Sequence, residues 1–66
     1  MKINKLKAKM VEKGINVETL SNRIGVERST LYRKLNNFEK ITIGEAARMK
    51  TVLEMTDAEA INIFLA

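Results

Sequence analysis

The sequence predicts an all-α fold of five short helices, and three observations support this prediction. The 66 residues include no proline, the residue that most strongly interrupts helices. Aromatic residues are few, and β-branched residues do not form the runs that are typical of strands. Apolar residues instead recur three and four positions apart, the spacing of one helix face. We expect residues 1–66 to form one small helical domain.

The first helix is expected over residues 2–13, with most of its lysines outside the apolar stripe. Gly14 ends this helix, because glycine adopts the left-handed conformation of a helix C-terminus without a Cβ penalty. The stripe follows the spacing i, i+3, i+7 and i+8 and comprises Ile3, Leu6, Met10 and Val11.

The second helix is expected to begin after Asn16, a favourable N-cap residue, and to end at Gly25. Leu20 and Ile24 lie one turn apart and face inward. Ser21 is small, so it lets another helix approach closely at that point.

The third helix is expected over residues 28–36, with Leu31 and Leu35 on its inward face. Glu27 precedes it, where a carboxylate suits the positive end of the helix dipole. We expect Asn37 to end the helix in the left-handed conformation, which asparagine tolerates.

Two further helices are predicted by T-x-x-E patterns at residues 42–45 and 56–59, each of which is typical of an N-terminal capping box. Phe38 and Ile41 are expected to enter the core from the preceding loop. The fourth helix extends to about Leu53, and its inner stripe comprises Ala46, Met49 and Leu53. The expected face of the fifth helix comprises Ala58, Ile61, Phe64 and Leu65.

The composition argues against several classes of function. Without cysteine or histidine, the chain lacks the usual zinc ligands, the commonest general base and a nucleophilic thiol. The three glycines are isolated, so no glycine-rich phosphate loop is present. No apolar run approaches the roughly 20 residues of a membrane span, and the basic N-terminus lacks the apolar core of a secretory signal. We expect no enzyme activity, metal, cofactor, small-molecule substrate or membrane insertion.

Charge is unevenly distributed along the chain. Residues 1–40 carry ten Lys or Arg and four Glu, a net charge of +6, whereas residues 41–66 carry two Lys or Arg and four Asp or Glu, a net charge of −2. One interpretation is that the lysines of the first helix only solvate its surface. The other is that the N-terminal two thirds of the chain face a polyanion.

Residues 17–36 have the pattern of a helix-turn-helix, in which one helix braces a second that lies in the DNA major groove. If Leu31 and Leu35 point inward, a turn of about 100° per residue places Arg33 opposite them. By the same count Ser29 and Asn37 lie about 40° from the outward axis, Asn36 and Thr30 about 60°, and Tyr32 and Lys34 about 100°. Arg28 falls on the inner flank, but its long side chain extends past the helix N-terminus.

The exposed side of the third helix suits DNA chemically. The guanidinium of Arg33 matches guanine O6 and N7 in the major groove. Tyr32 has two interpretations, contact with a sugar or thymine methyl and coverage of the core edge. Arg23, Lys34 and Lys40 suit either phosphate contact or ordinary solvated charge.

The stretch NVETLSNRIGVERSTLYRKLNN resembles the helix-turn-helix of lambda-repressor-like (Cro/CI or XRE) regulators of phages and bacteria. The tail TIGEAARMKTVLEMTDAEAINIFLA is similar to short repressor-like proteins of prophages in Gram-positive bacteria. The resemblance implies a repressor-type regulator in a bacterial cytoplasm or infected host, on the nucleoid. It also implies a symmetric homodimer on a pseudo-palindromic operator in double-stranded DNA.

The resemblance further suggests which side chains meet the DNA. The expected base contacts are Arg28, Ser29 and Arg33, followed by Thr30 and Tyr32. The expected backbone contacts, which also draw on the positions of the helix ends, are Asn16, Asn22, Arg23, Lys34, Asn36, Asn37 and Lys40.

This sequence departs from the family pattern at four positions. Val17 replaces a polar residue that touches phosphate in many relatives, and Asn37 replaces the usual glycine. Glu27 stands where serine or threonine is common, so its carboxylate faces the DNA or pairs with Arg28. Leu35, rather than residue 34, is expected to be buried, which leaves Lys34 exposed.

Other functions and the dimer surface remain open at this point. A protein-interaction module of the same fold, such as an antirepressor or a repressor partner, predicts weak DNA binding. RNA binding usually needs aromatic stacking residues, and this chain has few. Membrane anchoring by the first helix is also open, but the apolar face of that helix has no aromatic residue. The C-terminal residues INIFLA are the candidate dimer surface, or else Ile61, Phe64 and Leu65 complete the core and leave Ile63 and Ala66 for a partner.

Overall fold

The computed structural model describes residues 2–65 and shows a helical fold with no strand in that range. The prediction of an all-α chain with five α-helices is confirmed. The elements, which include one short 3-10 turn, are α1 (Ile3–Lys13), α2 (Val17–Ile24), α3 (Arg28–Asn36), η1 (Phe38–Lys40), α4 (Ile43–Val52) and α5 (Asp57–Phe64).

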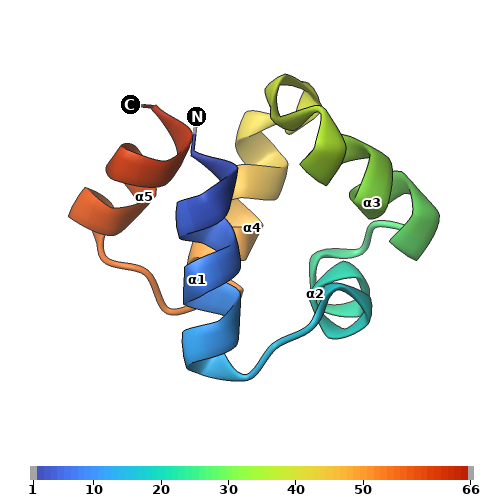
Figure 1. Ribbon diagram of the computed structural model, residues 1–66, viewed down its shortest axis with the longest axis horizontal. Helices are drawn as coiled ribbons and strands as arrows, with labels where there is room; N and C mark the ends of the chain where they lie inside the picture. Colours follow the sequence, from blue (N-terminus) through green and yellow to red (C-terminus); the bar gives the residue numbers. More distant parts are fainter. Residues whose placement is uncertain (1, 66) are drawn as a thin grey trace.

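Helix α1 lies between α5 on one side and the α2–α3 pair on the other, and α4 runs behind it (Figure 1). The first described residues lie against the last helix: the Lys2 backbone N–H donates a 2.8 Å hydrogen bond to the Ile63 carbonyl. Helix α2 packs against both α3 and α4, so it is the central support of that half of the molecule.

Every helix contributes side chains to one core. Phe38 and Phe64 stack with ring centroids 5.7 Å apart and an interplanar angle of 25°, which joins the 3-10 turn to the last helix. Phe38 and Ile41 are buried, as predicted. The buried apolar residues are Leu6, Met10, Leu20, Ile24, Leu31, Leu35, Phe38, Ile41, Met49, Leu53, Met55, Ile63 and Phe64.

Local signals in the sequence place most helix ends correctly. The side chain of Asn16 accepts a 2.8 Å hydrogen bond from the Thr19 N–H, and both predicted capping boxes are formed, at Thr42 and Thr56. Gly14 and Gly25 have φ of 66° and 74°, the left-handed conformation expected at these helix ends.

The predicted left-handed conformation of Asn37 is wrong. Its φ is −127° and its ψ is 77°, and its N–H still bonds to the Arg33 carbonyl. The chain continues directly into η1, where the Lys40 N–H bonds to the Asn37 carbonyl, so the end of α3 needs no reversal of handedness.

The predicted apolar stripe of α1 is correct for Leu6 and Met10 and wrong for Val11. Val11 is 82% exposed, whereas the side chain of Lys9 is only 10% exposed. Glu59 of α5 lies beside Lys9, whereas Val11 lies along an open groove between α1 and α3.

The predicted face of α5 is also largely wrong. Ile63 and Phe64 are buried, while Ala58, Ile61 and Leu65 are exposed. Helix α5 carries apolar residues on all its sides, so their spacing does not determine which face is buried. The stack of Phe64 on Phe38 and the hydrogen bond between Lys2 and Ile63 determine it instead. Ile63 is therefore a core residue rather than a partner contact, and Ala66 lies outside the described residues.

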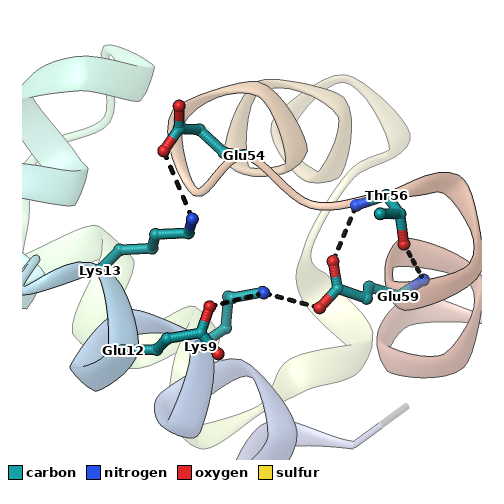
Figure 2. Close-up of polar contacts among 6 residues, drawn as sticks. All are labelled: Lys9, Glu12, Lys13, Glu54, Thr56 and Glu59. Carbon is teal, nitrogen blue, oxygen red and sulfur yellow. Dashed lines mark hydrogen bonds and ion pairs between the residues drawn. The ribbon is translucent and has the colours of Figure 1, made fainter.

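Polar contacts join the side of α1 to the end of α4 and the start of α5 (Figure 2). Lys9 Nζ lies 3.0 Å from Glu12 Oε2 and 2.6 Å from Glu59 Oε2. Lys13 Nζ lies 3.4 Å from Glu54 Oε1. The lysines on this side of α1 are thus engaged within the protein.

Candidate nucleic-acid interface

Helices α2 and α3 are joined by a tight corner at Gly25. The N–H groups of Gly25 and Val26 both bond to the Ser21 carbonyl and close the end of α2. Ser21 is buried, and its Oγ donates a 2.7 Å hydrogen bond to the Glu18 carbonyl. Because Ser21 is small and its hydroxyl is hydrogen-bonded within α2, it can be buried where α2 packs against the neighbouring helices, as expected from the sequence.

Helix α3 has a buried side and an exposed side. Leu31 and Leu35 are buried against α2 and the core, as predicted. Arg33 is exposed, and its Nη2 donates a 3.3 Å hydrogen bond to Thr30 Oγ1. The guanidinium is therefore presented at the surface and is partly oriented by its neighbour one turn earlier.

Carboxylates orient the first turn of α3. Arg28 is exposed, and its Nη1 lies 3.2 Å from Glu18 Oε2 on α2. Ser29 Oγ donates a 3.1 Å hydrogen bond to Glu27 Oε1. Of the two alternatives expected for Glu27, pairing with Arg28 is not the one found, because α2 brings Glu18 to the guanidinium instead.

Tyr32 is an exposed residue of α3, with about half of its surface accessible. It borders an apolar groove between α1 and α3, which also includes Val11, Val17 and Leu35. Val17, which replaces a polar residue of the family pattern, packs against the core beside this groove.

The residues predicted to contact the DNA backbone lie around both ends of the α2–α3 pair. Asn22 and Arg23 are exposed on α2, and Asn36 is exposed at the end of α3. Asn16 uses its side-chain oxygen as the α2 N-cap. A polar surface hollow at the C-terminal end of α3 is lined by Thr30, Arg33, Lys34, Asn37 and Lys40.

Lys34 differs from its expected exposed state. Its Nζ lies 2.6 Å from Glu45 Oε2, and both side chains are partly or largely buried. Burial pushes the pKa of Glu45 up, but the hydrogen bonds from Lys34 and from the Thr42 N–H outweigh this and lower the pKa overall. The capping pattern identified Glu45 as a helix-start residue, but its partner 11 positions earlier depends on the tertiary structure.

The other cations on this side are differently placed. Among the side chains that the structure describes, no carboxylate lies within ion-pair distance of Arg23, Arg33 or Lys40. Lys9 and Lys13, by contrast, are paired on the α1–α5 side. On α2, α3 and η1, the charges of Arg23, Arg33 and Lys40 are therefore available to an external polyanion.

The comparisons with known proteins agree with this arrangement. Within residues 2–65, none of the helices has the length and apolar character that crossing a membrane requires. No curated protein and no solved structure matches the chain. A family model described as the Cro/C1-type HTH DNA-binding domain matches residues 5–63, which include all five helices almost completely. The chain therefore belongs to the Cro/C1-type helix-turn-helix family of DNA-binding domains, whose members are regulators rather than enzymes.

Proposed function

We propose that the protein is a sequence-specific transcriptional regulator of the Cro/CI repressor type. In this proposal α3 enters the major groove of an operator half-site while α2 braces it. The observation that supports it most directly is the two-sided character of α3. Leu31 and Leu35 anchor one side in the core, and Arg33 is presented on the opposite side.

Arg33 is the principal base-reading residue in this proposal, because a guanidinium forms paired hydrogen bonds with guanine O6 and N7. Arg28 and Ser29 approach base edges from the first turn of α3, where the Glu18 and Glu27 carboxylates hold them in the free protein. Thr30 and Tyr32 are secondary candidates at the borders of the same surface.

Backbone contacts fix the position of the protein on the duplex without reading sequence. The N-terminus of α2 directs its free amide groups toward a phosphate in this proposal, next to Asn16. Lys34 is omitted from the proposed contacts because Glu45 engages its ammonium. The proposed backbone contacts are Asn16, Asn22, Arg23, Asn36, Asn37 and Lys40.

A symmetric homodimer is the proposed binding unit, because one short helix reads only about half of a site. Exposed apolar side chains on α4 and α5 support this part of the proposal. Ile43 is 88% exposed and Leu65 77% exposed, and both line an apolar groove of about 390 Å³ together with Ile61. Two half-sites about 34 Å apart on a pseudo-palindromic operator would match such a dimer.

The test is selection of bound sequences from a random pool of DNA duplexes at two salt concentrations. We expect one enriched motif with two-fold symmetry. We also expect log K to fall with log salt at a slope of about −0.9 for each phosphate neutralised. An enriched motif without symmetry would contradict the dimer but not the base-reading role of α3.

A protein-interaction module of the same fold is the second candidate function. The observation that favours it is the same apolar groove between α4 and α5, which is a suitable surface for a partner protein. This alternative predicts no enriched motif and a shallow salt dependence in the selection experiment, so the two candidates give opposite results.

A further inference from the structure

The recognition helix α3 is held unevenly by the rest of the fold. Helix α2 packs closely against both α3 and α4, whereas α3 and α4 approach each other at few positions. Leu31 and Leu35 fasten the inner side of α3. The Lys34–Glu45 ion pair, with 2.6 Å between Nζ and Oε2, joins α3 to the first turn of α4.

Glu45 is a rigid anchor for this link. Its residue surface is only 7% exposed, and its Oε1 accepts a 2.9 Å hydrogen bond from the Thr42 N–H. The Glu45 N–H in turn donates a 3.1 Å hydrogen bond to Thr42 Oγ1. The capping box therefore fixes the carboxylate at the N-terminus of α4. Lys34 is thus paired with a group that does not move when α3 moves.

Lys34 is also well placed to affect DNA reading, because it is the direct neighbour of Arg33. A helix of nine residues held along one side can rotate about its axis. Such a rotation would redirect the exposed guanidinium, and recognition requires side chains to stay within about 10–20° of the productive geometry. A link on the flank of α3 opposes this rotation.

We propose that Lys34 is a positioning residue whose pair with Glu45 sets the rotation of α3 and thereby the direction of Arg33, and that its ammonium neutralises no phosphate. This inference rests on the proposed DNA-binding function. It assigns Lys34 a role different from that of Lys40, which lies exposed in the following turn.

Four variants test the proposal on the selected operator. Lys34→Met removes the ammonium, and Glu45→Gln removes the carboxylate charge while keeping an oxygen for the capping box. We expect each to bind about 5- to 20-fold more weakly, with less preference at the Arg33 base pair and an unchanged salt slope. The double variant, which combines Lys34→Met with Glu45→Gln, should bind no more weakly than either single variant. Lys34→Arg keeps a cation that can pair with Glu45, so it should bind the operator like the unchanged chain.

Two matched lysine variants calibrate the experiment. Lys40→Met should reduce the magnitude of the salt slope by about 0.9, the effect of losing one phosphate contact. Lys13→Met removes a lysine of α1 that pairs with Glu54, 3.4 Å away after α4, and should change neither slope nor preference. All binding is measured at a temperature where circular dichroism shows each variant folded.

The opposite results would overturn the inference. A reduced salt slope for Lys34→Met, or tighter binding by Glu45→Gln, would mean that Lys34 contacts phosphate. Unchanged affinity or unchanged base preference in both variants would also overturn it. In either case selective binding by the unchanged chain leaves the proposed function intact, whereas its absence overturns both.

Discussion

Lys9 and Glu59 join the first helix to the last through a 2.6 Å contact between Nζ and Oε2 (Figure 2). The Glu59 carboxylate also accepts a 2.9 Å hydrogen bond from the Thr56 N–H, so one side chain caps α5 and binds α1. The hydrogen bond from Lys9, followed by that from Thr56, lowers the pKa of Glu59 to about 2. The hydrogen bonds to Glu59 and Glu12 raise the pKa of Lys9.

These shifts predict lower stability in acid. The pKa of Glu59 is about 2 in the folded chain, against an ordinary value of 4.5, so its stabilising contribution is complete above pH 4.5. The contribution is lost as pH falls from about 4.5 through about 2. Thermal unfolding followed by circular dichroism should show this loss.

Glu59→Gln supplies the comparison for the acid prediction. It keeps an oxygen for the capping box but carries no titratable group, so its melting temperature should fall less steeply over this pH range. Glu18→Gln removes an exposed carboxylate elsewhere and should retain the acid sensitivity of the unchanged chain. Parallel pH profiles for the unchanged chain and Glu59→Gln would contradict the assigned cause.

Arg33→Ala should weaken operator binding by about 1–3 kcal/mol and relax preference at one base pair, because the guanidinium reads a base edge in the proposed complex. The melting temperature should stay unchanged, since Arg33 is exposed. Lys5→Ala removes the same charge from α1 and should leave the base preference intact. Equal losses of stability and DNA affinity in Arg33→Ala would identify a structural role instead.

Gly25→Val should destabilise the fold by about 1–3 kcal/mol, because a β-branched residue resists positive φ. The cost comes from the backbone alone, since a Cβ at Gly25 meets no atom within 4 Å at its φ of +74°. Chemical denaturation measures the loss. Gly44→Ala is the matched control inside α4, where a Cβ makes only ordinary contacts, and it should be neutral or stabilising by up to about 1 kcal/mol.

Replacing Ile43 and Leu65 with glutamine should weaken the proposed dimer without unfolding the chain, because both side chains are largely exposed. Sedimentation velocity should show more monomer, and binding to a two-half-site operator should lose cooperativity. Val11→Gln changes an equally exposed apolar residue on α1 and should have neither effect. If the unchanged chain, the variant with glutamine at residues 43 and 65, and Val11→Gln all showed the same monomer fraction, the dimer surface would lie elsewhere.

Local chemistry allowed much of the fold to be predicted. The left-handed conformations at Gly14 and Gly25, the Asn16 cap and the two capping boxes involve residues within a few positions of one another. Their geometry depends on the backbone of a single turn, which the sequence specifies directly. The inward leucines of α3 follow from the same local period, and with them the exposed position of Arg33.

The sequence by itself therefore determined the helices, their ends and the two-sided character of α3. Only the tertiary structure decided which side of α5 is buried, why Val11 is exposed, and that Glu18 and Glu45 engage Arg28 and Lys34. The physical reason is range. Caps and periodicity act within one turn, whereas burial and ion pairing depend on which helices the fold brings together.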